Sequence, residues 1–537
     1  MSTRTPARTL TREQQRETEI RLNRGAHVAS TQVELASQTT SLVSVQQMAR
    51  KRIIPMPLQP PSVIAQLVRR LDMARKVHKK DNATHAYILA VIPAYETEDQ
   101  IDQTVRSLLT QSRPIDKIAV VINGPGISTA ARDCLQWLVE AEPGRLSIHE
   151  PPQLNGTHPS GKSKGSKVGA LNFAYEHYIQ RRDSIYDFVL GVDADIEADR
   201  EMVHHLEVDL IKRVKAAGTM ARYSFKIPDD TKGKSLALIH GQRHEFAVTG
   251  IKQQLRGYTS DILGGQATLF RVEALNEAAA VTDGGRPWSA RSQVEDAELT
   301  RTFQKLGYAC ATSARARAWT GLMHTPNAWQ KQRRKWQDGH LTDMIRDFRP
   351  FMDARRWRDQ FALGWNLLLR ILFFVTVTIS IALHQFKFHP LWLVPVGLAI
   401  LQSVLVAHKI PDRTLREIVR SFLFVPGELY YVRTLSVWLD SVALAIVNVR
   451  RDGWRNQARA EGSSSKKYAA SGWLIILVAI AVPLAGLLLC SNAVSVETMS
   501  IIVTCLWYAT AILTIGSTLG MLWLIIRMIR NCRRLAP

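Results

Sequence analysis

The sequence predicts an α/β domain built on one mostly parallel sheet, followed by an α-helical transmembrane region. From residue 86 onward, short apolar runs alternate with segments of helical period, a pattern that places helices on both faces of a parallel sheet. From residue 351 onward, apolar runs approach the roughly 20 residues that a helix needs to cross a bilayer. The chain has 537 residues, of which 46% are hydrophobic, so it is long and apolar enough for both parts.

Two stretches precede the α/β pattern. Residues 1–50 are rich in Thr, Ser, Gln, Arg and Glu and have no sustained apolar period, so we expect a disordered basic tail. Residues 51–85 begin with prolines and continue with apolar residues at helical spacing among Arg and Lys. This second stretch predicts an amphipathic helix that lies on the cytoplasmic face of a membrane or docks on the next domain.

Charge and cysteine content narrow the functional class. The formal net charge of +22 suits nucleic acid, anionic lipid or a phosphorylated substrate, and the apolar runs make lipid the preferred explanation. The 5 cysteines form no C-x-x-C pair, which argues against a zinc site or a disulfide framework and fits a reducing compartment. No apolar run follows the first methionine, so we expect no cleavable secretory signal.

The α/β pattern can be followed along a domain of residues 86–350. We expect strands at 87–92, 118–122, 146–149 and 188–192, with helices at 101–109, 129–139 and 168–179 between them. Ligands of such sheets bind at the carboxyl ends of the strands, where Tyr95, Asn123 and Asp195 fall. We therefore expect the functional site at this edge.

The apolar run 188–192 ends in two aspartates separated by one residue, Asp193 and Asp195. Alternate side chains of a strand share a face, so the two carboxylates can converge where the strand leaves the sheet. Two carboxylates with a free side suit Mg²⁺ or Mn²⁺, whose other ligands come from water and substrate phosphates. The alternative is a pair of solvated loop acids.

Residues 156–163 fit the P-loop pattern G-x-x-x-x-G-K-S, but their surroundings do not. A P-loop requires a strand that leads directly into the loop and a helix that begins at the lysine. Here Pro151 and Pro152 separate the loop from the preceding strand, and polar residues 164–166 stand where the helix should begin. The P-loop is therefore the less favoured interpretation.

Several motifs, taken in order along residues 87–336, resemble those of the family-2 glycosyltransferases, which include cellulose, chitin, hyaluronan and poly-N-acetylglucosamine synthases. They are Pro93-Ala94-Tyr95, Lys167-Val168-Gly169-Ala170-Leu171-Asn172, Asp193 with Asp195, Leu263-Gly264-Gly265-Gln266-Ala267, Val294-Glu295-Asp296 and Gln332-Arg333-Arg334-Lys335-Trp336. The resemblance implies a nucleotide-sugar-binding (GT-A type) fold in a processive membrane synthase.

The resemblance also implies a role for each matching residue. Asp296 would be the catalytic base, and Asp193 and Asp195 would bind the metal. The donor-binding residues would be Pro93, Ala94, Tyr95, Asn123, Lys167, Asp193, Gln332, Arg333 and Lys335. The acceptor-binding residues would be Gly264, Gly265, Gln266, Glu295 and Trp336.

Four residues depart from the family pattern. Asn123 stands where the family usually has an aspartate that contacts the nucleoside. Glu96 and Thr97 replace the usual Asn-Glu pair. Lys335 replaces an arginine, which keeps a positive charge but loses the planar fork that grips a diphosphate.

These residues predict an inverting transfer from a nucleotide sugar, expected to be UDP-linked, to a growing polysaccharide or other glycan. A metal would neutralise the charge that develops on the diphosphate as the sugar leaves. Asp296, at the start of a predicted helix at 297–306, would accept the proton of the acceptor hydroxyl. One base and direct displacement imply inversion at the sugar carbon.

The last third of the chain, residues 351–537, is expected to form the membrane region. We expect spans at about 363–383, 391–407, 473–490 and 501–526. Residues 415–455 carry Glu428, Arg433 and Asp440 within apolar sequence, so we expect interfacial helices there. One or two further crossings in this segment are the competing interpretation.

The distribution of Lys and Arg predicts the orientation in a cell membrane. The loops at 413–420, 450–459 and 527–534 are basic and would be cytoplasmic, whereas the loop at 385–390 has one lysine and that at 491–497 has none. The catalytic domain and both termini would therefore lie in the cytoplasm.

Two other functions fit parts of this pattern. An enzyme of the same fold could add a single sugar to a lipid-linked or other acceptor without polymerising. A membrane transporter with a nucleotide-binding cytosolic domain would need ionisable residues in its spans, where Arg370 is nearly alone. The expected partners are a nucleotide sugar, a glycan or lipid-linked acceptor and membrane lipids, and not nucleic acid.

Overall fold

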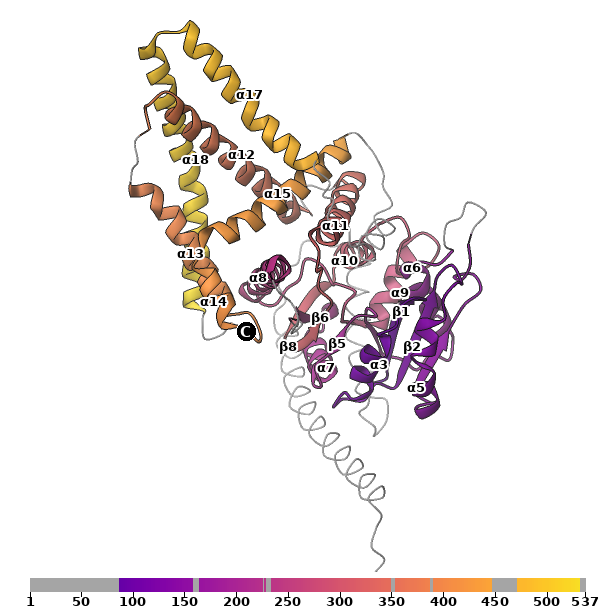
Figure 1. The fold of residues 1–537 in the computed structure, drawn as a ribbon. Coiled ribbons are helices and arrows are strands. Elements are labelled where there is room, and N and C mark those ends of the chain that lie inside the picture. Colours follow the sequence, from indigo (N-terminus) through magenta and orange to yellow (C-terminus); the bar gives the residue numbers. More distant parts are fainter. Residues whose placement is uncertain are drawn as a thin grey trace, which may run out of the picture.

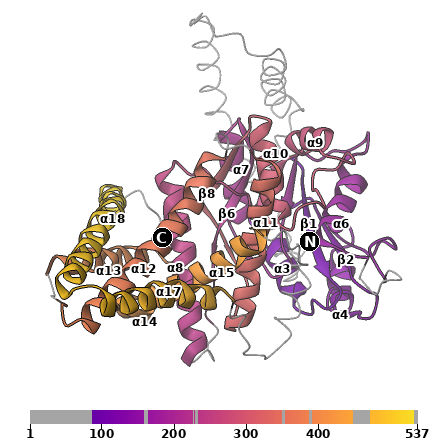
Figure 2. The same ribbon diagram turned by 90° about the horizontal axis from the view of Figure 1, so that it is seen from above.

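The computed structural model describes residues 86–157, 164–225, 227, 233–348, 353–386, 390–446 and 471–531. The expected basic tail and amphipathic helix, at 1–85, and residues 158–163 of the P-loop-like segment lie outside this part of the chain. The described residues form an α/β domain and an elongated helical region beside it (Figures 1 and 2).

The α/β domain is built on an eight-stranded sheet with the strand order β3-β2-β1-β4-β7-β6-β8-β5. The strands are β1 (Ile88–Tyr95), β2 (Lys117–Asn123), β3 (Leu146–His149), β4 (Phe188–Gly191), β5 (Glu197–Ala198), β6 (Ala216–Ser224), β7 (Thr268–Arg271) and β8 (Ala309–Trp319). Strands β3, β2, β1 and β4 are parallel. Strand β7 runs antiparallel to β4 and β6, β8 is parallel to β6, and β5 is antiparallel to β8. The predicted α/β fold is confirmed, with a parallel first half and a mixed second half of the sheet.

Helices cover both faces of the sheet. This is expected, because successive side chains of β1 point to opposite faces and are apolar on both. Their bounds are α3 (Ile101–Leu109), α4 (Ala130–Asp133), α5 (Gln136–Ala141), α6 (Lys167–Ala174), η1 (Tyr175–Ile179), α7 (Met202–Lys212), α8 (Gly233–Leu255), α9 (Val272–Val281), α10 (Glu295–Lys305) and α11 (Pro326–Arg346). Ile88, Ala90 and Ile92 pack into the core that contains α3, α5 and α7. Leu89 and Val91 pack into the opposite core, with α6, α9 and α10. This period of two explains why the strand is apolar at nearly every position.

The helical region follows α11. It contains α12 (Ala354–Ala382), η2 (Pro390–Trp392), α13 (Leu393–Ala407), α14 (Leu415–Ser421), α15 (Phe424–Ile446), α17 (Ser471–Ala493) and α18 (Val496–Arg530). Among the described residues, five helices are long and apolar enough to cross a membrane: those at Ala354–Ala382, Pro390–Ala407, Phe424–Ile446, Gly472–Cys490 and Val496–Arg530. Four of them contain the four expected spans, and the fifth is α15.

Helix α15 lies between the two parts of the molecule (Figure 1). On one side Val437 packs with Leu238 of α8 and Trp329 of α11. On the other side Leu435 packs with Leu367 of α12 and Ile476 of α17. An apolar helix with a partner on each side is consistent with the expected interfacial position, which stays a prediction because α15 also has the length and composition of a span.

Candidate active site

The site forms where neighbouring parallel strands end together. Strand β1 is in register with β2, so that Pro93 lies beside Val121 and Tyr95 beside Asn123. On its other side Val91 lies beside Gly191, the last residue of β4. The carboxyl ends of β1, β2 and β4 therefore share one edge, which is where ligands bind in sheets of this kind.

The ammonium group of Lys167 occupies the centre of this edge. Its Nζ lies 2.7 Å from Asp193 Oδ1, 2.9 Å from Glu295 Oε1 and 3.8 Å from Asp296 Oδ2. Burial alone would lower the pKa of this ammonium, but the three carboxylates outweigh burial and hold the pKa well above its ordinary value. Lys167 is therefore charged and contacts carboxylates from two distant segments, one with Asp193 and one with Glu295 and Asp296.

Asp296 lies in the first turn of α10 and points at the turn that precedes β7. Its Oδ2 accepts a hydrogen bond from the Gly265 amide at 2.7 Å. Burial first, and then the charges of Glu295 and Asp193, raise its pKa to about 7, although Lys167 and the Gly265 amide act in the opposite direction. A carboxyl group with this pKa can exchange a proton near neutral pH, which suits a general base.

Asp195 is held by the segment that follows β8. Its Oδ2 accepts hydrogen bonds from the Gly321 amide at 3.1 Å and from the Thr320 hydroxyl at 3.2 Å. Burial, followed by the charge of Asp193, raises the pKa of Asp195. The two carboxylates thus repel each other, and a cation between them would remove that cost.

The chemistry of this donor set fits a divalent cation such as Mg²⁺ or Mn²⁺. Asp193 and Asp195 supply hard oxygen ligands, although Lys167 already pairs with Asp193 Oδ1 and a cation would have to bind the other carboxylate oxygens. In the part of the chain that the structure describes, no group of three or more His, Cys, Asp or Glu side chains is arranged to hold an ion. A metal held by Asp193 and Asp195 would need its other ligands from water or substrate.

A small cavity joins the predicted donor, metal and base residues. It is lined by Pro93, Lys167, Leu171, Gly191, Val192, Asp193, Gly265, Phe270, Trp288 and Asp296. A Cβ on Gly265 would come within 2.7 Å of Lys167 Nζ and 2.8 Å of Asp296 Oδ2, so both groups would have to shift to make room for it. At position 265 the chain therefore presents only backbone atoms to Lys167 and Asp296.

Other predicted residues surround this cavity without lining it. The Asn123 side chain donates to the Ala94 carbonyl at 2.7 Å and ties the ends of β1 and β2 together, and Tyr95 is partly exposed at the same edge. The Gly264 carbonyl accepts from Thr268 at 2.6 Å, which fixes the turn before Gly265. Gln266 follows in that turn, between Gly265 and β7.

The four predicted residues on α11 lie outside the cavity lining. Arg333 turns toward α8, where its Nη2 lies 3.0 Å from Glu245 Oε2, and its guanidinium lies 4.4 Å from the centroid of the Trp336 ring. The Gln332 side chain accepts a hydrogen bond from Arg333. Lys335 is buried. The predicted contacts of Gln332, Arg333 and Lys335 with a donor, and of Trp336 with an acceptor, stay predictions.

Sequence reasoning missed several residues that shape the site. Trp288 lines the cavity and is fixed by Asn172, whose side chain donates to its carbonyl at 2.8 Å. Thr320 and Gly321 hold Asp195, and a Cβ on Gly321 would meet Asp195 Oδ2 at 2.8 Å. These residues lie in irregular loops, where no periodic pattern marks them, so only the neighbouring motifs could have directed attention to them.

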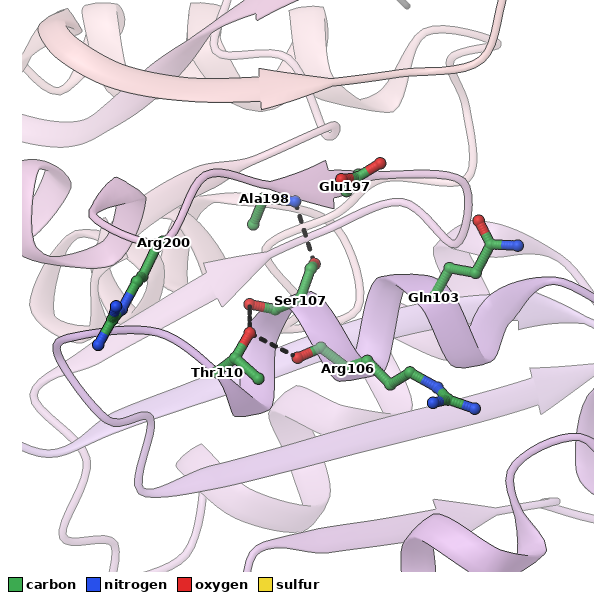
Figure 3. Close-up of a pocket in the computed structure, with 7 residues that line it drawn as sticks. All are labelled: Gln103, Arg106, Ser107, Thr110, Glu197, Ala198 and Arg200. Carbon is green, nitrogen blue, oxygen red and sulfur yellow. Dashed lines mark hydrogen bonds between the residues drawn. The ribbon is translucent and has the colours of Figure 1, made fainter. Parts of the chain in front are cut away.

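A second, open depression lies away from the predicted residues, between α3 and β5 (Figure 3). It is lined by Gln103, Arg106, Ser107, Thr110, Glu197, Ala198 and Arg200. The chain reaches β5 directly after Asp195, so this depression lies behind the loop that carries the two aspartates.

Comparison with known proteins supports a glycosyltransferase. Residues 240–406 match the family described as "Glycosyl transferase family group 2", and this segment includes Asp296 and residues 332–336. The chain is 23% identical over 297 residues to "Probable glycosyltransferase YdaM" of Bacillus subtilis (strain 168), covering 55% of this chain and 65% of that protein. It is 25% identical over 226 residues to "Glucomannan 4-beta-mannosyltransferase 7" of Arabidopsis thaliana, covering 41% of this chain and 36% of that protein. The match thus spans less than two thirds of the length of either relative.

Solved structures also resemble the chain, at low similarity. The mannosyltransferase PcManGT from Pyrobaculum calidifontis, in complex with GDP-Man and Mn²⁺, has a TM-score of 0.41 and 16% identity, covering 72% of this chain and 99% of that chain. Glucosyl-3-phosphoglycerate synthase from Mycobacterium tuberculosis, in complex with Mn²⁺, UDP and glucosyl-3-phosphoglycerate, has a TM-score of 0.30 and 17% identity, covering 54% of this chain and 86% of that chain. Similarity at this level carries no argument about substrate.

Proposed function

We propose that the chain is a family-2 glycosyltransferase of the membrane, which transfers a sugar with inversion from a nucleotide sugar to a glycan acceptor. The observation that carries the proposal is one cavity in which Asp296, Lys167 and Asp193 meet at the carboxyl ends of parallel strands. This transfer requires a base, a positive charge and a pair of carboxylates. Here these would be Asp296, Lys167, and Asp193 with Asp195. The family match over residues 240–406 supports the same reaction class.

Asp296 would act as the base. It would accept the proton of an acceptor hydroxyl as that oxygen bonds to the anomeric carbon of the sugar. The bond from this carbon to the diphosphate oxygen would break, and the nucleoside diphosphate would leave with the electron pair. A single displacement from the face opposite the leaving group inverts the configuration.

Lys167 would balance charge on both sides of the reaction. Its ammonium lies against Asp193 and Glu295 and is close to Asp296, so it offsets the negative charge of the carboxylates next to which a diphosphate would bind. Asp193 and Asp195 would hold a divalent cation, which supplies further charge neutralisation when it is bound.

The donor is proposed to be UDP-linked and the acceptor to be a growing polysaccharide. Apolar helices that are long enough to cross a membrane, directly after the catalytic domain, support an acceptor that is handled at the membrane. Trp336 lies on the helix that contacts both α8 and α15; the Arg333 guanidinium covers one face of its ring, so a sugar ring would have to stack on the opposite face.

A donor panel tests the proposal. The detergent-solubilised protein is incubated with UDP- and GDP-linked sugars and Mn²⁺, and the released nucleoside diphosphate is measured. At least one donor is expected to be consumed, with Asp195→Asn and EDTA as controls that remove turnover. A flat response of the parent protein to every donor would contradict the proposal.

A further inference from the structure

Helix α3 holds the loop that carries the two aspartates from behind. The Thr104 hydroxyl donates a 2.6 Å hydrogen bond to the carbonyl oxygen of Ala194, the residue between Asp193 and Asp195. Thr104 is 2% exposed, so this bond is shielded from water. Thr104 thus connects α3, which packs in the core with α5 and α7, to the backbone between the two predicted metal ligands.

Two further side chains of the same helix face continue this support. Ser107 Oγ accepts from the Ala198 amide at 3.0 Å, a contact that Figure 3 shows. Gln111, just beyond the end of the helix, donates to the Asp199 carbonyl at 2.7 Å and accepts from the Val203 amide at 3.0 Å. Positions 104, 107 and 111 share one side of a helix, so they form a polar row that follows the loop from Ala194 onward.

The helix that carries this row is itself fixed. Ile101, Val105 and Leu108 are buried in the core against β1, at the spacing of an adjacent helix face. The loop is therefore tied to a rigid element rather than to another loop. Functional side chains have to be held to roughly 0.5 Å, and a backbone bond to a packed helix provides such a restraint.

The contacts of the two carboxylates do not restrain the backbone between them, which Thr104 contacts. Lys167 holds the Asp193 carboxylate, and Thr320 with Gly321 holds that of Asp195. These contacts orient the side chains but not the peptide between them. Of the three residues in the polar row, Thr104 is the one that contacts this peptide, because Ser107 and Gln111 bind the chain after Asp195.

We propose that Thr104 is a positioning residue for the metal site, which fixes the spacing of the Asp193 and Asp195 carboxylates through the Ala194 carbonyl. This inference rests on the proposed function, because it assigns the aspartates to a divalent cation. Without the Thr104 hydroxyl the buried carbonyl loses its donor, and the loop gains by turning this carbonyl toward water. The two carboxylates then no longer converge.

The test measures Mn²⁺ binding rather than turnover. Mn²⁺ affinity is determined by electron paramagnetic resonance on the full-length protein in detergent, with UDP and separately with GDP present. Thr104→Val keeps the shape of the side chain and should weaken Mn²⁺ binding by roughly five- to thirty-fold. Thr104→Ser keeps the hydroxyl and should bind within about twofold of the parent protein. Thr104→Ala provides a second variant without the hydroxyl, should the valine variant fold poorly.

A matched control separates positioning from general stability. Ser313 of β8 donates a 2.6 Å hydrogen bond to Asp209 of α7, so Ser313→Ala also removes a long-range bond, in this case a partly buried one that does not involve the two predicted metal ligands. This variant should lose heat stability and keep its Mn²⁺ affinity. Equal Mn²⁺ affinity in Thr104→Val, Thr104→Ala and the parent protein would overturn the inference and leave the proposed function standing. If the parent protein bound no Mn²⁺ with either nucleotide, the metal role of the proposed function would itself be overturned.

Discussion

The charge balance around Lys167 determines how Asp296 behaves. Burial, Glu295 and Asp193 raise the pKa of the Asp296 carboxyl, and Lys167 lowers it, with a result of about 7. Only the ionised carboxylate can accept a proton from an acceptor hydroxyl. The residues next to the base therefore decide the pH at which it works.

The turnover rate should follow this pKa. We expect it to be constant above a pH of about 7 and to fall roughly tenfold per pH unit below it, because the protonated fraction of Asp296 rises. Nucleoside diphosphate release, measured between pH 5 and 9 at a donor concentration well below KM, gives the profile of kcat/KM, which reports the pKa of the free enzyme. A rate that stays level down to pH 5 would contradict the assignment of Asp296.

The raised pKa of Asp296 also affects the stability of the folded protein. Because the folded protein keeps the proton of Asp296 at pH values where the unfolded chain has lost it, this group makes folding less favourable as the pH rises from about 4 to about 7. Asp296→Asn should therefore be at least as heat-stable as the parent protein at pH 7.5. This provides the control that any loss of turnover in that variant is not a loss of fold.

Gly265 tests the close packing of the cavity. A Cβ at this position would come within 2.7 Å of Lys167 Nζ and 2.8 Å of Asp296 Oδ2. Gly265→Ala should displace both groups and lower kcat by roughly tenfold to a hundredfold, since small displacements of reacting groups are costly. Gly144→Ala is the matched control, because a Cβ there has nothing within 4 Å. Equal kcat values for the two variants would show that the cavity tolerates the extra atom.

Helix α8 packs against α15 of the helical region. Gly241 of α8 lies directly against the Tyr430 ring of α15, where a Cβ would come within 2.2 Å of the ring. Tyr430 in turn donates to Glu245 at 2.6 Å, and Glu245 pairs with Arg333 of α11. The absence of a side chain at 241 therefore allows three helices to share one polar cluster.

Gly241→Ala should destabilise the protein. Alanine favours a helix over glycine by roughly 1 kcal/mol, but overpacking against a buried ring costs about 1–3 kcal/mol, and the ring cannot move without breaking its bond to Glu245. We expect a lower Tm for the detergent-solubilised variant. Gly427→Ala, at a position of α15 with open space around it, should leave Tm unchanged or raise it. A Gly241→Ala protein as stable as the parent would mean that α8 and α15 pack less closely than described.

The elements that could be predicted from the sequence are those with a strong local signal. Strands β1, β2 and β4 are continuous apolar runs. Helix α3 has an apolar face, and α12 is an apolar run long enough to cross a membrane. Strand β6, by contrast, reads AAGTMARYS, which carries little β pattern, and it pairs with β8, which lies far along the chain. Its position depends on tertiary packing, which local propensity does not determine.

The residues of the candidate site also fall into two groups, those that belong to a sequence motif and those that do not. Asp193, Asp195, Lys167 and Asp296 belong to short motifs, and the structure brings them together at one edge. Their supports, such as Thr104, are ordinary polar residues whose importance comes only from the backbone atom that they contact. No spacing in the sequence distinguishes a threonine that binds the Ala194 carbonyl from one that faces solvent.

Considered as a whole, the molecule has its predicted catalytic cavity in one part and its apolar helices in the other, with α8, α11 and α15 between them (Figure 1). Basic side chains occur at 413–420, mostly in α14, and at 527–531, at the end of α18, where Arg527 donates a hydrogen bond to the Leu255 carbonyl of α8. Positive loops remain on the cytoplasmic side of membranes. We therefore predict that the α/β domain faces the cytoplasm.

Protease accessibility measures this orientation. Protease added to intact cells should leave residues 86–348 uncut, and the same protease should digest them after the membrane is permeabilised. Fragments of the α/β domain released from intact cells would reverse the predicted topology.

The most direct test of the account compares three proteins on one nucleotide sugar: the parent chain, Asp296→Asn and Glu295→Gln. Both carboxylates lie near Lys167, but Glu295 is buried against its ammonium at 2.9 Å, whereas Asp296 is partly exposed in the cavity. Asp296→Asn should lower kcat by roughly 10²–10⁴-fold with little change in donor affinity, and Glu295→Gln should lose less. An Asp296→Asn protein that transfers sugar at close to the parent rate would contradict the central claim that this carboxylate is the base.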